Sequence, residues 1–313
     1  MSVGKTEPNS NFSTRACPVC GSRRPQLIYD QGRGKKFDTK VCMGCGFVYV
    51  PDISRQDGDY RTHEKDDFEP ETIDRVLKAE TRAREMAERR FANIKANAPD
   101  LIAAKGRLHD IGASLGFFMK CWSEVGFDVT GCEPDGYYAR ISQKHFGFEM
   151  APCLYEERPV EEAAYDVITM CHVLEHVPDP RRILQRIRTE LKPDGKLYIE
   201  IPHIDRPYSG NLDRFFWAEH LNYFSLRTLD GLLRSEGYRI SKSGGLGYFL
   251  WVVAEKAPRE QISGALPLDC PDEIRQRTMV SILHHQAREI KDLKARMLAL
   301  EKHLTKPAPV AGR

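Results

Sequence analysis

The stretch LHDIGASLGFF at Leu108–Phe118 decides the fold, because it places an acidic residue at the end of an apolar run, before a turn of small residues. We expect a strand, a loop and a helix in that order. Gly112 and Gly116 would let a ligand approach the backbone at the carboxyl edge of a parallel sheet. A dinucleotide site prefers the spacing GxGxxG, whereas the spacing here is GxxxG and Asp110 would repel a phosphate. Asp110 therefore favours a cationic group, such as an ammonium or a sulfonium.

Strand and helix patterns alternate on both sides of this stretch, across residues 107–256. The strand-like segments are Arg107–Ile111, Asp128–Glu133, Asp166–Met170, Lys196–Ile201, Tyr238–Ser243 and Tyr248–Glu255. Helical patterns separate the first four, at Phe117–Val125, Tyr137–Phe146 and Arg181–Leu191. This alternation predicts an α/β fold with a doubly wound, mostly parallel sheet. Only SGGLG joins the last two segments, so we expect a hairpin that ends the sheet with an antiparallel strand.

Glu133 follows the second strand in the sequence TGCEPD, 23 residues after Asp110. A carboxylate at that place can accept two hydrogen bonds from a ribose diol. Residues 107–256 therefore predict a site for a ligand with a cationic group and a ribose.

Several motifs together resemble class I S-adenosylmethionine-dependent methyltransferases. They are DIGASLG at 110–116, GCEP at 131–134, YDVI at 165–168, HVLEHVPDP at 172–180 and LKPDGKL at 191–197. The resemblance covers residues 101–257 and implies a seven-stranded sheet with S-adenosyl-L-methionine as cofactor. It also implies the cofactor-binding residues, which are Asp110, Gly112, Ser114, Gly116, Glu133, Cys171 and His172. Ser114 departs from the family pattern, which often has glycine there.

Two CxxCG motifs stand near the N-terminus, with 21 residues between Cys20 and Cys42. They contain Cys17, Cys20, Cys42 and Cys45. Four thiolates at this spacing predict a tetrahedral structural zinc ion in a zinc ribbon over residues 1–50. A redox CxxC or a coincidence is the alternative. Residues 1–50 carry eight Lys or Arg against three Asp or Glu. These basic side chains could bind the phosphates of a nucleic acid or of a nucleotide-linked substrate, or they could belong to a solvated loop.

A base is needed if the methyl acceptor is a hydroxyl or a carbon. The segment EHLNYFS at 219–225 ends a long aromatic stretch after the fourth of the six strand-like segments, and it contains the favoured base His220 with Glu219 or Tyr223 nearby. The alternative is that His220 caps a helix that begins near Ser225 or orders the loop. With the zinc ribbon, this segment narrows the resemblance to bacterial methyltransferases of surface polysaccharides, nucleotide-linked sugars or secondary metabolites.

Composition changes divide the rest of the chain. We expect a connector and an amphipathic helix at 51–100, the methyltransferase domain at 101–257, a linker at 258–271, a C-terminal helix at 272–305 and a disordered tail at 306–313. Apolar residues recur along one face of this helix at 279–304. In a parallel pair of such helices, oppositely charged residues beside that face would lie opposite each other, which predicts a coiled-coil homodimer. The alternative is that this helix folds back onto its own domain.

The composition bounds the function. A net charge of +2, with 41% hydrophobic and 29% charged residues, is typical of a globular protein. The longest apolar run, Tyr248–Ala254, is only strand-sized and the N-terminus has no apolar stretch, so we expect neither a transmembrane segment nor a signal peptide. We expect a cytoplasmic methyltransferase that acts on a small molecule, with a sugar or glycan hydroxyl favoured over nucleic acid. An RNA methyltransferase that uses the basic ribbon, and a non-catalytic scaffold, are the alternatives. The segment CHVLEHV does not resemble the Asn/Asp-Pro-Pro-aromatic motif of base N-methyltransferases, and this difference argues against the RNA alternative.

Overall fold

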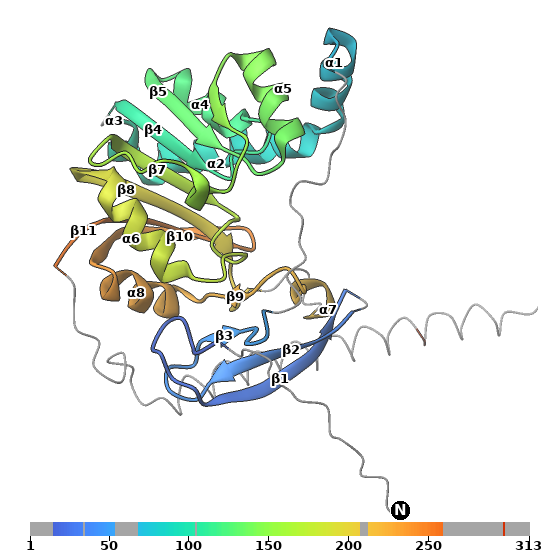
Figure 1. Cartoon of the computed structure of the whole chain (residues 1–313), viewed down its shortest axis with the longest axis vertical. Coiled ribbons are helices and arrows are strands. Elements are labelled where there is room, and N and C mark those ends of the chain that lie inside the picture. Colours follow the sequence, from blue (N-terminus) through green and yellow to red (C-terminus); the bar gives the residue numbers. More distant parts are fainter. Residues whose placement is uncertain are drawn as a thin grey trace, which may run out of the picture.

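The computed structural model describes residues 15–33, 35–53, 68–103, 105–206, 212–258 and 297. Two sheets form its framework, a seven-stranded sheet and a smaller four-stranded one beneath it in Figure 1. The predicted linker 258–271, C-terminal helix 272–305 and tail 306–313 lie outside the described residues, apart from Pro258 and Met297. None of the described helices is long and apolar enough to span a membrane.

The seven-stranded sheet confirms the predicted α/β fold. Its strands are β4 (Gly106–Ile111), β5 (Phe127–Cys132), β6 (Glu149–Ala151), β7 (Tyr165–Cys171), β8 (Leu191–Pro202), β10 (Tyr238–Leu246) and β11 (Phe249–Lys256). They lie in the order β10-β11-β8-β7-β4-β5-β6. The five strands from β8 to β6 are parallel to one another, whereas β11 pairs antiparallel with both β8 and β10. The hairpin at the end of the sheet is thus confirmed.

Helices cover both faces of this sheet (Figure 1). One face carries α2 (Thr81–Asn97), α3 (Pro99–Ala103), α4 (Phe117–Ser123) and α5 (Gly136–Phe146). The other carries α6 (Pro180–Glu190) and α8 (Leu226–Ser235). The single amphipathic helix expected within residues 51–100 is instead two helices, because Glu80 leaves helical geometry between α1 (Pro70–Ala79) and α2.

The four-stranded sheet joins the N-terminal segment to a loop of the larger domain. It consists of β1 (Pro25–Gly32), β2 (Lys35–Cys42), β3 (Val48–Tyr49) and β9 (Asn222–Tyr223), all antiparallel. Strand β9 lies between β8 and α8 in the chain, after the short helix α7 (Leu212–Phe215). The loop that contains the favoured base His220 therefore contributes a strand to the sheet of the N-terminal segment.

Two arginines reinforce this junction. Arg15 donates to the carbonyls of Pro178 and Leu221 at 2.8 and 2.6 Å. Arg181 donates to the carbonyl of Pro18 at 2.7 Å and also to that of Val19. The apolar residues around the four cysteines share one core with α6 and α8, so the N-terminal segment and the larger domain pack as a continuous unit.

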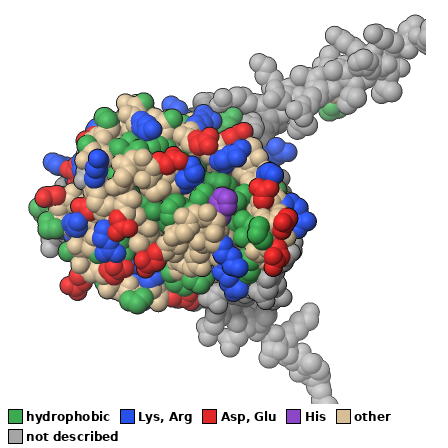
Figure 2. Space-filling view, turned by 90° about the horizontal axis from the view of Figure 1, so that it is seen from above, with side chains coloured by type: hydrophobic (Ala, Val, Ile, Leu, Met, Phe, Trp, Pro, Cys, Tyr) green, Lys and Arg blue, Asp and Glu red, His purple; other side chains and the backbone are tan. Residues whose placement is uncertain are grey.

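Figure 2 shows the face that is seen from above in Figure 1. On the described part of this face, Lys and Arg side chains alternate with Asp and Glu side chains. Neither sign of charge forms a continuous track there, so this face lacks the basic stripe that the phosphates of a nucleic acid require.

Candidate functional site

A cavity of about 200 Å³ lies at the carboxyl end of β4 and β7, beneath α2. Five of the residues that the sequence assigned to the cofactor line it. They are Asp110, Gly112, Ser114, Cys171 and His172. Gly116 and Glu133 do not line this cavity. Helix α2 closes it with Ala83, Met86, Ala87 and Arg90, residues that the sequence analysis did not connect with the cofactor.

The loop 112–116 needs small residues because its backbone adopts positive φ angles and lies close to neighbouring side chains. Gly112 has φ +70°, and a Cβ there would lie 2.5 Å from a methyl carbon of Val173. Gly116 has φ +81°, and a Cβ there would lie 2.3 Å from the Ser142 hydroxyl. Ser114 also adopts a positive φ, of 51°. Gly116 therefore acts by letting α4 pack closely against α5, rather than by lining the cavity.

Glu133 holds the loop in place. One carboxylate oxygen accepts from Ser114 N–H at 2.8 Å, and the other accepts from Asp135 N–H at 2.9 Å. Each carboxylate oxygen has two lone pairs, so both can accept a further hydrogen bond. The position of Glu133 beside Ser114 is compatible with the predicted contact to a ribose.

Asp110 is the buried acid of this site, with 3% of its surface exposed. The Thr169 hydroxyl donates to its carboxylate at 2.5 Å. Burial raises the pKa of Asp110 to about 7, although the hydrogen bond from Thr169 and the charge of Arg90 both act to lower it. A carboxylate that is destabilised by burial gains most from a cationic ligand, since the ligand restores favourable electrostatics.

Next to Asp110, a buried ion pair connects α2 with β8. Arg90 donates to one oxygen of Glu200 from Nε at 2.9 Å and from Nη2 at 2.6 Å. His172 Nε2 lies 3.2 Å from the same oxygen, and the Tyr198 hydroxyl donates to the other at 3.2 Å. Burial alone would raise the pKa of Glu200, but His172 and Arg90 outweigh it and lower the pKa to about 2. Glu200 therefore stays ionised and holds α2 over the cavity.

Replacing Arg90 with methionine is expected to destabilise the chain by about 3–5 kcal/mol, because the fully buried Glu200 then loses its main partner. Denaturant unfolding of Arg90→Met and of Arg89→Met measures this. Arg89 is exposed, so its substitution should leave the unfolding midpoint nearly unchanged. Equal midpoints for the two variants would show that the ion pair does not hold α2.

His172 sits between the cavity and a second polar cluster. It has φ +57°, and its backbone N–H donates to the carbonyl of Glu200 at 2.8 Å. Its Nδ1 lies 3.3 Å from a carboxylate oxygen of Glu175. Burial by itself would lower the pKa of His172, but Glu175 and Glu200 raise it to about 9, so the imidazole carries a positive charge at neutral pH.

The second cluster contains His220, the residue favoured as base. His220 is buried, and its ring lies 4.7 Å from that of His176, centroid to centroid. Burial lowers the pKa of His220 to about 3, against the raising effect of the Glu175 charge. The imidazole is therefore neutral and offers a lone pair. The N-cap of α8 is Ser225, whose side chain accepts from Thr228 N–H, so His220 does not have the alternative role of capping that helix.

The other two expected residues lie beside it. The Tyr223 hydroxyl donates to the Trp217 carbonyl at 3.0 Å and accepts from Trp217 N–H at 3.1 Å. This pairing fixes the loop. The backbone carbonyl of Glu219 accepts from His176 Nδ1 at 3.0 Å, and the Glu219 side chain is partly exposed.

The N-terminal hairpin reaches this cluster. Arg33, at the turn between β1 and β2, places its guanidinium carbon 4.1 Å from the centre of a Trp217 ring. Trp217 in turn contacts the rings of His176 and His220 at 5.8 and 5.0 Å. One of the basic residues of the ribbon thus stands at the edge of the candidate acceptor site.

The four cysteine thiols converge as predicted. Cys17 and Cys45 have their sulfurs 3.6 Å apart, and those of Cys20 and Cys42 are 3.5 Å apart. Tetrahedral zinc with Zn–S bonds of about 2.3 Å requires sulfur separations of roughly 3.8 Å. The separations are far too long for disulfides and fit a Zn²⁺ site. None of the eight described cysteines forms a disulfide.

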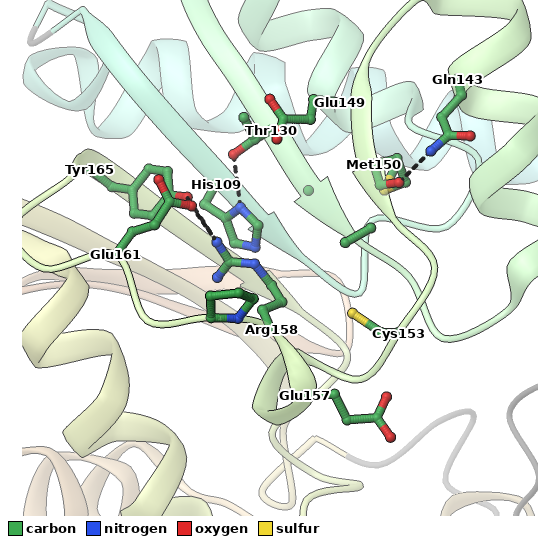
Figure 3. A pocket seen from close by; sticks show the side chains of 13 residues that line it. His109, Thr130, Gln143, Glu149, Met150, Cys153, Glu157, Arg158, Glu161 and Tyr165 are labelled. Carbon is green, nitrogen blue, oxygen red and sulfur yellow. Dashed lines mark hydrogen bonds and ion pairs between the residues drawn. The ribbon is translucent and has the colours of Figure 1, made fainter.

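A larger cavity of about 630 Å³ lies on the other face of the sheet (Figure 3). It is bounded by β4 to β7 and by the segment 153–161. His109 points into this region and pairs through Nδ1 with Thr130 at 2.8 Å. His109 and Asp110 are neighbours in β4 and face opposite sides of the sheet, and the two cavities share no lining residue.

Comparisons with known proteins agree with this fold. The profile of the family described as "Methyltransferase domain" matches residues 80–243, just over half of the chain. A ubiquinone biosynthesis O-methyltransferase of Aeromonas salmonicida is 34% identical over 125 residues, which are 37% of this chain and 50% of that protein. The C-methyltransferase NovU of Streptomyces niveus is 26% identical over 136 residues, which are 42% of this chain and 32% of that protein. The chain thus spans half or less of these two relatives.

Two solved structures are also similar to parts of this chain. The mitomycin 7-O-methyltransferase MmcR is 25% identical, with a TM-score of 0.46 over 56% of this chain and 54% of that one. An S-adenosylmethionine-dependent methyltransferase of Mesorhizobium loti is 17% identical, with a TM-score of 0.42 over 50% of this chain and 96% of that one.

Proposed function

The chain belongs to the methyltransferase-domain family, and from this membership we propose that it transfers a methyl group from S-adenosyl-L-methionine to a small-molecule acceptor. We propose a sugar or glycan hydroxyl as that acceptor. The observation that carries the proposal is the cavity bounded by Asp110 and the loop 112–116, which adjoins a cluster of neutral and charged imidazoles through His172. These contacts support the proposal of a cofactor site beside a proton-accepting site.

When bound, S-adenosyl-L-methionine supplies an electrophilic methyl group on a sulfonium. The residues of the chain bind and orient it. Asp110 and the carboxyl edge of β4 favour its cationic part, Glu133 would accept hydrogen bonds from the ribose hydroxyls, and Gly112 lets the backbone come close. Ser114, Cys171 and His172 complete the lining.

On the acceptor side, His220 takes the proton of the attacking hydroxyl. Its neutral imidazole has the lone pair that this step needs, and the ionised Glu175 raises the pKa of His220 and so favours the imidazolium that forms. Tyr223 positions the loop through Trp217. The partly exposed ring of Trp217 and side chain of Glu219 supply an aromatic face and a hydrogen-bond acceptor, which suit a sugar ring.

The four cysteines are proposed to bind one structural zinc ion. All four positions of a tetrahedral ion are filled by thiolates, so no position is open for substrate. The ion would hold the hairpin that presents Arg33 to Trp217.

The affinity for S-adenosyl-L-methionine is expected to fall as the pH drops below about 7. Burial raises the pKa of Asp110 to about 7, so the carboxylate is ionised above that pH and protonated below it, and only the ionised form attracts a cation. The dissociation constant should rise by up to about tenfold per pH unit below pH 7. Calorimetry across this range measures it, with Asp110→Asn as the control, which should bind weakly at every pH. A wild-type affinity that is constant from pH 5.5 to 8 would contradict the role of Asp110.

The proposed reaction is tested by incubating the whole chain with methyl-labelled cofactor and a set of nucleotide-linked sugars, glycans, phenols and RNA. Label in a sugar or glycan supports the full proposal. Label in another small molecule supports methyl transfer but rejects the sugar. Label in RNA alone would overturn the small-molecule acceptor.

A further inference from the structure

Three side chains next to the cofactor cavity converge on one point. One carboxylate oxygen of Glu175 and one ring nitrogen each of His176 and His220 lie within 4.8 Å of one another. The first two follow β7 and the third precedes β9. We propose that Glu175, His176 and His220 bind a single divalent transition-metal ion, at a site separate from the four cysteines.

Two of these three side chains are buried with polar atoms that have no hydrogen-bond partner in the described part of the chain. Glu175 is 1% exposed; its Oε1 faces Nδ1 of His172 at 3.3 Å, and its Oε2 has no hydrogen-bond partner among the described residues. His220 is 4% exposed, and its Nδ1 has no hydrogen-bond partner within the residues that the structure describes. Buried polar groups are nearly always satisfied, and a buried carboxylate with one oxygen left without a donor is among the most costly of them. A cation at the centre of the cluster would satisfy both side chains.

The histidine tautomers suit coordination. His176 Nδ1 lies 3.0 Å from the Glu219 carbonyl oxygen, which can only accept, so Nδ1 carries the proton and Nε2 of the neutral ring has the lone pair. Metal-binding histidines typically donate their second ring N–H to a backbone carbonyl in this way. The backbone also holds the two segments together, since Leu221 N–H and Asn222 N–H both donate to the Glu175 carbonyl, at 2.7 and 3.0 Å.

The donor set indicates the kind of ion. Two imidazoles and one carboxylate suit Zn²⁺, Co²⁺, Ni²⁺ or Fe²⁺ better than Mg²⁺ or Ca²⁺, which prefer oxygen ligands. Metal–ligand distances of about 2.0–2.2 Å place ligand atoms about 3–4 Å apart, so a small inward rotation of the side chains would complete the site. The cation His172 lies 3.3 Å from Oε1 of Glu175, and the second oxygen of Glu175 remains available to the ion.

The proposed function gives this site a consequence. This consequence rests on the proposed function, in which His220 removes the proton of the acceptor. An ion that occupies the ring nitrogen of His220 takes the lone pair that the proton would need, so the ion inhibits methyl transfer. The site would make the enzyme sensitive to free transition metals while the zinc of the ribbon stays in place.

Cobalt titration of the whole chain, with its cysteines loaded with zinc, tests the binding. We expect one further Co²⁺ to bind, with visible d–d absorption and without a thiolate-to-cobalt charge-transfer band. Glu175→Gln and His176→Gln should abolish the absorption, whereas His145→Gln, an exposed histidine on α5, should retain it. No absorption in the wild-type chain, or absorption that survives both Glu175→Gln and His176→Gln, would overturn the site.

Two further readouts separate this inference from the proposed function. Calorimetry with S-adenosyl-L-methionine in the absence of added metal reports cofactor binding, and the cobalt spectrum reports the metal site whether or not methyl transfer is found. With an active acceptor, Co²⁺ should inhibit turnover at the concentration at which the spectrum saturates. Stimulation by Co²⁺ would overturn the inhibitory role and also the assignment of His220 as base.

Discussion

Replacing Cys42 with serine is expected to abolish zinc binding and to unfold the N-terminal segment of residues 15–53. A structural zinc ion contributes about 10–16 kcal/mol of binding free energy in small zinc modules, far more than that short segment can gain from burial alone. Cys42 is fully buried, and its sulfur accepts from Gly44 N–H at 3.3 Å. Zinc content by atomic emission, together with limited proteolysis of the segment, measures the loss.

Cys153→Ser is the matched control, because Cys153 is a partly buried thiol outside the cluster. This variant should keep one equivalent of zinc and resist proteolysis like the wild-type chain. If Cys42→Ser also keeps one equivalent of tightly bound zinc, the four-thiolate site is wrong.

The effect should extend to the acceptor side of the enzyme. Strand β9 pairs with β3, and Phe215, Phe216 and Tyr223 pack against apolar residues of the ribbon. Loss of the zinc ion would therefore disorganise the loop that contains His220, whereas the cofactor cavity is lined entirely by residues beyond position 80.

Replacing His220 with glutamine is expected to lower kcat by about 10²–10⁴-fold, the usual contribution of a general base. The cofactor affinity should stay unchanged, because His220 does not line the cofactor cavity. Initial rates with the acceptor that takes up label, measured without added metal, give kcat, and calorimetry gives the cofactor affinity.

His145→Gln again serves as the control and should retain full turnover. Full turnover of His220→Gln would refute the base assignment. A loss of cofactor affinity that matches the loss of rate would instead indicate that His220 organises the cofactor cavity.

Much of the fold could be predicted because its signals are local. The alternation of strands and helices and the glycine-rich link before β11 depend on residues that are neighbours in the sequence. Strand β6 was missed as a segment because three residues carry no periodicity. The break between α1 and α2 was also missed, since Glu80 lies within a continuous apolar stripe.

The site was only partly predictable, because its remaining residues act through contacts distant in sequence. Arg90 and Glu200 are 110 residues apart, and only the single acid within the apolar strand LYIEIP hinted at a buried partner. Glu175 stood inside a recognised motif, but its approach to His220 depends on how β9 docks against the ribbon. A strand of two residues, such as β9, has no sequence pattern that would predict which strand it pairs with.

Calorimetric titration of the zinc-loaded chain with S-adenosyl-L-methionine at pH 8 tests the central claim most directly. We expect one binding site per chain, with an affinity about 10–100-fold weaker in Asp110→Asn, since a charged interaction in a buried site contributes about 1.5–3 kcal/mol. The absence of any binding by the zinc-loaded wild-type chain, or equal binding by Asp110→Asn, would contradict the account.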